Sequence, residues 1–367
     1  MRGAVLTGLN EPLEIVDDLE VIEPRAGEVK VKMHTTGLCH SDLSVINGTI
    51  MQPMPCVLGH EGAGVIEAVG DGVTDVSPGD HVVLSFVSQC GNCYFCKRHE
   101  PYLCEKGTQA MATAALYDGT PAFSRGGKPV TQMSGCGTFA EYTVVPAGGV
   151  VKIDDSISLE AAALVGCGVT TGVGAVLNTA EVKPGSTVAV IGTGGVGLNV
   201  IQGAVVAGAE KIIAVDLLDN KLEMAKQFGA TDVVNAGSGN PVAEVQSLTE
   251  GRGADYTFEV IGMAATMTQA YQMARRGGTA VMVGVPKMGE LFSVMGFFPV
   301  YENKAIKGCW YGSADTRRDF PEYLDLYKEG KLKLDELITR EFTLDEINDG
   351  FEALKNGEVA RGVVRYD

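Results

Sequence analysis

Alternation of hydrophobic and polar residues near the N-terminus predicts β-strands. Val29, Val31 and Met33 alternate with charged or polar residues, the period-two pattern of a half-buried strand. Further short apolar runs at 65–69 and 82–86 are each bounded by glycine or proline, which interrupt strands. Many short strands separated by turns are typical of a small β-barrel, so we expect one in the first half of the chain.

From about residue 186 the pattern changes to strands that alternate with helices. A β-branched run at 186–191 is followed by a glycine-rich loop, a helical stretch to about 207 and a second apolar run at 211–215. The alternation continues through three further segments, which are 255–260, 279–285 and roughly 291–311. This order predicts an α/β fold with a doubly wound parallel sheet.

Two other segments lie outside these patterns. Residues 105–135 are rich in Gly, Thr, Ala and Pro without a clear period. We expect them to form a long functional or interface loop, since such connections are uncommon in compact domains. Beyond residue 315 apolar residues recur at helical spacing, and the run at 361–366 predicts a closing strand.

Composition narrows the class of protein. A chain of 367 residues with 45% hydrophobic and 20% charged residues suits a globular protein of two domains. A net charge of −17 argues against nucleic acid and anionic membranes as partners, because both require clustered Lys and Arg. No apolar run approaches the roughly 18 residues of a membrane span. Because the N-terminus also lacks signal-peptide character, we expect a cytoplasmic protein.

The cysteines are unevenly distributed. There are nine, which in a chain of this kind indicates metal binding or free thiols rather than disulfides. Four of them lie within fifteen residues, at Cys90, Cys93, Cys96 and Cys104. Four thiolates at this spacing can close a tetrahedral zinc site without leaving a position for water. We therefore expect a structural zinc that holds a lobe at 88–106, which has little apolar core of its own.

A second metal site is indicated by Cys39 and His60. A thiolate and an imidazole are ligands that Zn²⁺ prefers, and the nearby Asp42 and Glu61 are suitable outer partners. These residues predict a catalytic zinc with one open position, and its third ligand must come from elsewhere in the chain. Cys167 has no cysteine near it, and a lone cysteine is more often a small buried hydrophobe than a ligand.

The glycine-rich loop carries the signature of a dinucleotide-binding site. It follows a strand, opens a helix, and is followed by a second strand that ends in Asp216. Its glycines allow a pyrophosphate to approach the helix N-terminus. Asp216 is placed to accept hydrogen bonds from an adenosine ribose and repels a 2′-phosphate, so NAD is favoured over NADP; Lys221 is a further candidate for the ribose. The loop residues expected at the cofactor are Gly192, Gly194, Gly195, Val196 and Gly197.

With these motifs in hand, the chain resembles the zinc-dependent medium-chain alcohol dehydrogenases over essentially its full length. Gly59-His60-Glu61-x-x-Gly64, the cysteine quartet, Gly166-Cys167-Gly168 and the glycine loop occur in that family's order and spacing. The connection at 105–135 is similar to that of the longer, typically dimeric branch. The resemblance therefore implies a homodimer, with a homotetramer as the alternative.

The resemblance also implies a domain arrangement and a set of site residues. A GroES-like β-barrel catalytic domain would span 1–168, a Rossmann NAD-binding domain 169–309, and 310–367 would return to the catalytic domain. The zinc ligands implied are Cys39, His60 and Cys167 at the catalytic ion, and Cys90, Cys93, Cys96 and Cys104 at the structural ion. His40 and Arg361 would meet the pyrophosphate, Thr171 and Val196 would border the nicotinamide, and Val285 would join the cofactor site. Asp42 would orient His60, Glu61 would lie behind the metal, and Ile50 and Phe86 would line the substrate pocket.

The implied reaction is oxidation of a primary or secondary alcohol with hydride transfer to NAD, and its reverse. Ser41 matches the hydroxyl residue that bonds the substrate oxygen. Several members end the proton relay in a histidine three residues later, where this chain has Ser44, which cannot store a proton near neutral pH. We expect the proton to leave through the cofactor ribose and water, assisted by Ser44.

Two alternative functions are retained. One branch of the family oxidises an S-hydroxymethyl thiol adduct of formaldehyde and places an acidic residue in its pocket, where this chain has the apolar Ile50. The other alternative is a zinc- and NAD-binding sensor without catalysis. The intact ligand set and Ser41 count against it.

Overall fold

The computed structural model describes residues 1–366, which form two compact units. The first contains Met1–Cys167, Asp315–Glu329 and 334–366, and the second contains Gly168–Ala314 and Gly330–Lys333. The sequence predicts boundaries after 168 and 309, whereas the contacts divide the chain after Cys167 and Ala314. The short segment Gly330–Lys333 also packs with the second unit, because Lys333 N donates to Gln202 Oε1 at 2.6 Å.

The first unit is built from two sheets. One has the order β2-β1-β5-β9-β8-β3, and the other has the order β11-β7-β6-β4-β19-β18, with β10 paired to β4. The strands of the first sheet are β1 (Gly3–Leu6), β2 (Glu14–Val16), β3 (Leu19–Val21), β5 (Cys56–Val57), β8 (Phe123–Arg125) and β9 (Lys128–Gln132). Those of the second are β4 (Glu28–Gly37), β6 (Gly62–Val69), β7 (His81–Leu84), β10 (Tyr142–Pro146), β11 (Val150–Lys152), β18 (Ile338–Thr343) and β19 (Arg361–Arg365).

The period-two prediction for the first long strand is confirmed. In β4, Val29, Val31 and Met33 are buried, while the lysines between them reach solvent or lie half-buried. Their side chains form a core with residues of β6 and β7. The same strand pairs with β6, β10 and β19, so it lies at the centre of the sheet.

The expectation of a long loop at 105–135 is wrong. This segment contains helix α2 (Glu105–Thr113) and the hairpin β8–β9. The helix begins where Cys104 Sγ accepts a hydrogen bond from Gly107 N, a capping role for which a cysteine is an unusual choice. The hairpin turns through Gly126 and Gly127, whose positive φ angles of 55° and 72° suit a two-residue hairpin loop.

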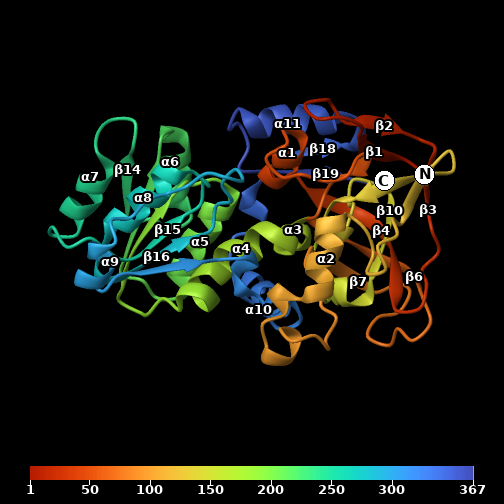
Figure 1. Ribbon diagram of the computed structural model, residues 1–367, viewed down its shortest axis with the longest axis horizontal. Coiled ribbons are helices and arrows are strands. Elements are labelled where there is room, and N and C mark those ends of the chain that lie inside the picture. Colours follow the sequence, from red (N-terminus) through yellow and green to blue (C-terminus); the bar gives the residue numbers. More distant parts are fainter. Residues whose placement is uncertain (367) are drawn as a thin grey trace. The chain divides into compact units, whose positions relative to one another are not determined.

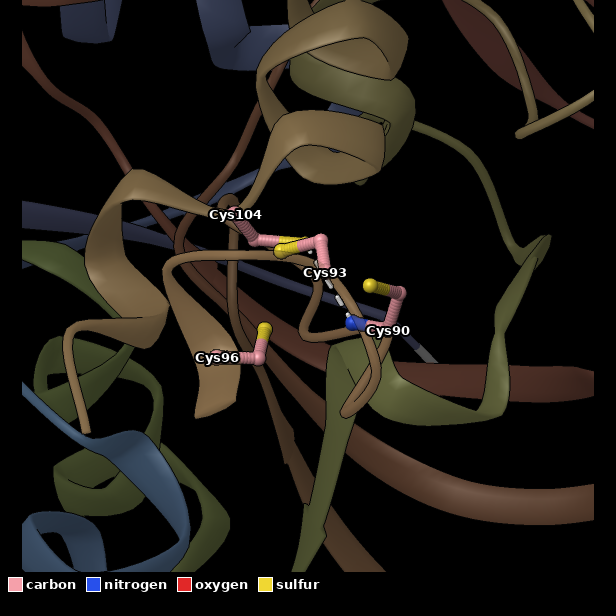
Figure 2. A group of neighbouring side chains, drawn as sticks. All are labelled: Cys90, Cys93, Cys96 and Cys104. Carbon is pink, nitrogen blue, oxygen red and sulfur yellow. Dashed lines mark hydrogen bonds between the residues drawn. The ribbon is translucent and has the colours of Figure 1, made fainter. Parts of the chain in front are cut away.

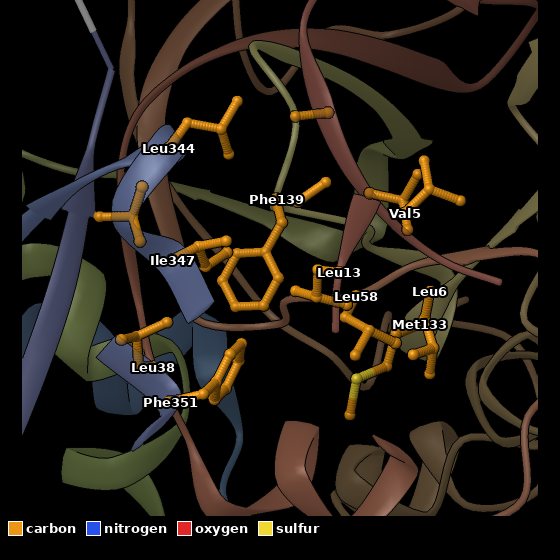
Figure 3. Close-up of a cluster of buried hydrophobic side chains, with 14 of the residues drawn as sticks. Val5, Leu6, Leu13, Leu38, Leu58, Met133, Phe139, Leu344, Ile347 and Phe351 are labelled. Atoms are coloured by element: carbon orange, nitrogen blue, oxygen red, sulfur yellow. The ribbon is translucent and has the colours of Figure 1, made fainter. Parts of the chain in front are cut away.

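The C-terminal segment returns to the first unit. It contributes α10 (Thr316–Lys328), α11 (Ile347–Lys355), and strands β18 and β19, of which β19 runs antiparallel to β4. Figure 3 shows Phe351 of α11 and Phe139 in one cluster of buried side chains, with Leu38 nearby. The two rings meet edge to face, with their centroids 5.8 Å apart. This cluster fixes the start of α1 (His40–Ile46), which carries much of the site.

The second unit contains the predicted parallel sheet. Its strand order is β14-β13-β12-β15-β16-β17, and the five strand pairs are all parallel (Figure 1). The strands are β12 (Thr187–Ile191), β13 (Lys211–Asp216), β14 (Asp232–Asn235), β15 (Ala254–Glu259), β16 (Ala274–Met282) and β17 (Ala305–Gly308). The helices are α4 (Thr170–Gly174), α5 (Gly195–Val206), α6 (Asp219–Gln227), α7 (Pro241–Leu248), α8 (Ala264–Met273) and α9 (Phe297–Tyr301). The strand order reverses between β12 and β15, where ligands bind in sheets of this kind.

One helical stretch is longer and more apolar than the sequence pattern suggested. Leu159–Ala180, which begins with α3 (Leu159–Leu164), spans 22 residues with a mean hydropathy of 1.5 over its most apolar window. Of that window, 89% is buried within the fold, as is usual for a core helix of a globular protein.

Candidate active site

Cys39 is held at the start of α1 by its own helix. Its backbone is extended, with φ −123° and ψ 150°, and its N–H donates to Asp42 Oδ2 at 3.2 Å. Asp42 is fully buried, and its other oxygen, Oδ1, accepts from Gly59 N at 3.0 Å. Asp42 therefore joins the Cys39 turn to the segment that carries His60.

Four residues bring potential metal ligands together. Each of Cys39, His60, Glu61 and Cys167 offers one ligand atom, all within 4.8 Å of one another and all buried. Two zinc bonds of about 2.3 Å place ligand atoms no more than about 4.6 Å apart, and the 4.8 Å within which this group lies is close to that limit. Two thiolates and an imidazole are the ligands of a catalytic zinc site that keeps one position open.

The environment of His60 also fits a metal ligand. Its Nδ1 lies 3.4 Å from Asp42 Oδ1, and its Nε2 is buried without a hydrogen-bond partner in the part of the chain that the structure describes. A buried ring nitrogen without a partner is costly, and a metal ion removes that cost. A carboxylate beside the opposite nitrogen is the usual arrangement for a metal-binding histidine.

The chemistry of Cys39 is consistent with this interpretation. A hydrogen bond from Cys167, together with the nearby His60 and Arg361, holds the pKa of the Cys39 thiol well below its usual range. Because the thiolate is the form that binds metals, the site favours the ligand state of this cysteine. Cys39 Sγ also lies 3.6 Å from Ser41 Oγ, so the predicted hydroxyl residue sits beside the ligand group.

Glu61 and Arg361 form a buried ion pair. Arg361 Nη2 donates to Glu61 Oε1, and the two side chains are 4% and 0% exposed. Burial raises the pKa of Glu61 to about 7, an effect that the charge of Arg361 opposes. Gly37 makes room for the carboxylate, because a Cβ at this position would overlap Glu61 Oε2. The structure thus places Arg361 beside the ligand group, and its expected contact with a pyrophosphate stays a prediction.

The cysteine quartet also converges. Figure 2 shows the sulfurs of Cys90, Cys93, Cys96 and Cys104 around one point, and they lie within 4.8 Å of one another. Cys104 Sγ accepts from Cys90 N at 3.3 Å and from Gly107 N at 3.4 Å. Backbone donors of this kind stabilise a thiolate, so the quartet fits a zinc ion with no open position.

The glycine loop has the geometry of a phosphate cradle. Gly192 has φ +92°, which favours glycine, and a Cβ on Gly197 would overlap Gly192 O. By contrast, a Cβ on Gly194 would meet nothing within 4 Å, so open space lies beside the loop where α5 begins. Backbone N–H groups at that helix start can face a pyrophosphate.

Asp216 ends β13 beside this loop. Its Oδ2 accepts from Thr193 N at 2.8 Å and from Thr193 Oγ1 at 3.1 Å. Its Oδ1 accepts from Leu217 N at 2.8 Å and from Leu218 N at 3.2 Å. The acid and the glycine loop are therefore joined directly, and the expected contact of Asp216 with a ribose stays a prediction.

The remaining predicted residues lie within one unit or the other. In the first, His40 is exposed at the start of α1, Ser44 and Ile50 are half-buried, and the Phe86 ring packs edge-on against His60 at 5.6 Å and 88°. In the second, a Cβ on Gly172 of α4 would lie 2.5 Å from Val196 O. That close approach brings the helix of Thr171 against the start of α5. Lys221 is half-buried in α6, and Val285 is 55% exposed just beyond β16.

Glu259 belongs to this region and was not predicted from the sequence. It is fully buried at the end of β15, where its Oε1 accepts from Ile261 N at 3.0 Å, Gly262 N at 2.8 Å and Thr266 Oγ1 at 2.7 Å. These bonds shape the loop that packs against Gly192 through Ile261. Glu259 could have been found from the sequence, because it is an acidic residue at the end of a predicted buried strand, where ligands bind in sheets of this kind.

The chain matches two family models. Residues 25–155 match the alcohol dehydrogenase GroES-like domain, and residues 195–329 match the zinc-binding dehydrogenase domain. An S-(hydroxymethyl)glutathione dehydrogenase of Escherichia coli is 41% identical over 368 residues, covering 100% of this chain and 99% of the relative.

Solved structures agree with these matches. The benzyl alcohol dehydrogenase of Acinetobacter calcoaceticus superimposes with a TM-score of 0.95 at 33% identity, covering 100% of this chain and 99% of that one. An alcohol dehydrogenase zinc-binding domain protein from Burkholderia ambifaria gives 0.95 at 32% identity, with coverage of 100% and 98%.

The chain belongs to the zinc-dependent medium-chain alcohol dehydrogenase family. Its two units are a GroES-like catalytic domain and a Rossmann-type cofactor domain, as expected. This alcohol dehydrogenase uses NAD and two zinc ions, one catalytic and one structural. It interconverts a primary or secondary alcohol with an aldehyde or ketone by hydride transfer to or from NAD.

Proposed function

We propose that Cys39, His60 and Cys167 hold the catalytic zinc, and that this alcohol dehydrogenase acts on apolar, preferably aromatic, alcohols. The observation that carries the substrate class is the Phe86 ring packed edge-on against the ring of His60. Ile50 adds a second apolar side chain and packs against the main hydrophobic core of the first unit. An aromatic ring beside the ligand group favours an uncharged, flat substrate.

The residues of the first unit have separate tasks in this proposal. Zinc lowers the pKa of an alcohol that it binds, and NAD accepts the hydride. Asp42 fixes the ring of His60 so that Nε2 faces the other ligands. Ser41, beside Cys39, accepts the proton of the substrate hydroxyl and passes its own onward. Ser44 would assist that transfer, and with the cofactor bound its ribose and water would offer the onward route for the proton.

The second unit holds the cofactor. Gly192, Gly194, Gly195, Val196 and Gly197 receive the pyrophosphate at the start of α5, and Asp216 accepts the adenosine ribose hydroxyls. Lys221 supports the ribose, Thr171 and Val196 border the nicotinamide, and Val285 joins the cofactor site. The contacts of His40 and Arg361 with the pyrophosphate stay predictions from the resemblance. None of the nine cysteines, which all lie in the described residues, forms a disulfide, and this suits the reducing environment of a cytoplasmic enzyme.

Substrate preference can be measured directly. The purified holoenzyme is expected to oxidise benzyl alcohol with a kcat/KM at least about tenfold above that for S-(hydroxymethyl)glutathione. The reason is that apolar side chains cannot offset the cost of burying the carboxylates of the glutathione adduct. The high net negative charge also disfavours an anionic substrate. The measurement is NAD reduction with benzyl alcohol, hexanol and the glutathione adduct on one enzyme sample.

The thiol adduct is the second candidate substrate, and the 41% identity to relatives with that activity supports it. A preference for the adduct would overturn the apolar assignment. Absence of turnover with every alcohol, in a sample containing both zinc ions, would instead support the sensor alternative. Phe86→Ala distinguishes further, since it is expected to raise KM for benzyl alcohol more than for hexanol.

We propose a homodimer that forms along β17. This strand is the edge of the parallel sheet, and all four of its residues are exposed. The adjoining segment exposes large apolar side chains, including Met288 at 93%, Leu291 at 86% and Val300 at 83%. An edge strand beside such a surface is an aggregation hazard unless it is covered, and a second copy of the strand can extend the sheet.

If the protein is a homodimer, its mass in solution is twice the mass of one chain. Val300→Asp is expected to give monomers in sedimentation velocity, because it places a charge in the apolar surface. Leu217→Asp, at an exposed apolar residue outside this segment, is expected to leave the dimer intact. A monomeric wild-type protein at micromolar concentration would contradict the proposal, and a tetramer would show that a second surface also associates.

A further inference from the structure

The hydrogen bonds of Asp216 leave no acceptor position open. An ionised carboxylate offers about four lone-pair positions. In this structure each oxygen of Asp216 already accepts two hydrogen bonds, from Leu217 N and Leu218 N at Oδ1 and from the two donors of Thr193 at Oδ2. The proposed ribose acceptor is therefore filled by donors of the protein itself.

Three of those donors are backbone N–H groups, and one is a hydroxyl. The backbone donors, on Thr193, Leu217 and Leu218, fix the plane of the carboxylate from both sides and cannot move without the chain. The Thr193 hydroxyl makes the longest but one of the four bonds, at 3.1 Å, and its hydrogen can turn away. The hydroxyl therefore fills an acceptor position of the carboxylate but does not orient the carboxylate.

Thr193 also lies where it can compete with a ligand. Thr193 itself is 1% exposed, but the next residue, Gly194, borders open space. The ribose hydroxyls are donors, and the carboxylate of Asp216 is the acceptor proposed for them. A ribose that approaches Oδ2 therefore has to displace the hydrogen bond from Thr193 Oγ1.

We propose that the Thr193 hydroxyl competes with the adenosine ribose of NAD for Asp216, and thereby weakens cofactor binding and speeds cofactor release. The inference rests on the proposed role of Asp216. No covalent step is involved, because the hydroxyl keeps its proton and only exchanges its acceptor. Thr193 acts on the cofactor through Asp216 and lowers the affinity of the cofactor site.

The test is cofactor affinity, measured by titration calorimetry without turnover. Thr193→Val keeps the shape of the side chain and the backbone N–H but removes the hydroxyl. It is expected to lower the Kd for NAD about three- to tenfold, which is the change in affinity that one hydrogen bond typically causes. The dissociation rate of NADH should fall by a similar factor, because affinity changes within one site act mainly on release.

Three comparisons make the result specific. Thr193→Ser, which retains a hydroxyl, should have a Kd closer to wild type than that of Thr193→Val. Thr257→Val removes a buried hydroxyl that donates to Ala270 O elsewhere in the sheet, and should not change the Kd. An NAD analogue with a 2′,3′-dideoxyadenosine has no ribose donors there, so Thr193→Val should not tighten its binding.

Asp216→Asn separates this inference from the function on which it rests. If Asp216 receives the ribose, this variant raises the Kd for NAD at least about tenfold. If the Kd does not change, the role of Asp216 fails and the competition fails with it. If Asp216→Asn weakens binding but Thr193→Val leaves the Kd unchanged or raises it, only the competition is overturned. Thr193→Ala repeats the test with a smaller side chain should the valine variant unfold.

Discussion

Cys167→Ala is expected to remove one of the two zinc ions per chain and to lower kcat/KM for alcohol oxidation by at least about a thousandfold. A catalytic zinc ion needs three protein ligands, and the two that remain in this variant hold zinc poorly. When the ion is lost, the buried His60 Nε2 has no partner. Zinc content by atomic emission and turnover with benzyl alcohol are measured on the same sample.

Cys136→Ala is the matched control for that variant. Cys136 is buried in the same unit, but its Sγ donates to Ser85 O at 3.7 Å rather than facing a ligand group. It should retain both zinc ions and wild-type turnover. Retention of two zinc ions by Cys167→Ala, with turnover preserved, would show that Cys167 is only a small buried side chain.

Arg361→Gln is expected to destabilise the protein by about 3–5 kcal/mol, because it leaves the carboxylate of Glu61 buried without its cation. The free energy of unfolding, or the midpoint of urea unfolding of the first unit, measures this change. Zinc-loaded protein is used throughout, so that the ligand group is in the same state in each variant.

Arg365→Gln provides the comparison on the same strand. Arg365 is 48% exposed and pairs with Glu160 and Glu341, each at 3.2 Å, so its loss should cost less than about 1 kcal/mol. Equal effects of the two variants would show that burial does not strengthen the Glu61–Arg361 pair. The Kd for NAD of Arg361→Gln also tests the pyrophosphate contact expected from the sequence.

Local patterns were sufficient to predict much of this enzyme. The alternation at Val29, Val31 and Met33 predicted β4 because side chains of a strand point to opposite faces in turn. The glycine loop and Asp216 could be recognised together in the sequence. A strand, a tight turn, a helix and a second strand leave few other ways to place the acid relative to the loop. The four cysteines of the quartet could be predicted to form one metal site because they are close in sequence.

Long-range pairing was beyond those patterns. Glu61 and Arg361 are 300 residues apart, and nothing near either residue indicates that both become buried together. The segment 105–135 was misinterpreted for another reason. Its helix starts at an unusual cap, Cys104, and its hairpin depends on the Gly126-Gly127 turn, which outweighs the weak strand pattern on either side. Cys167 was assigned by resemblance, because a lone cysteine carries no local signal.

Anomalous diffraction at the zinc edge, from crystals of the purified protein, shows directly whether both zinc sites are occupied. We expect two zinc peaks per chain, one among the ligand atoms of Cys39, His60 and Cys167, and one among the sulfurs of Cys90, Cys93, Cys96 and Cys104. A catalytically active crystal form with no peak at the first position would contradict it.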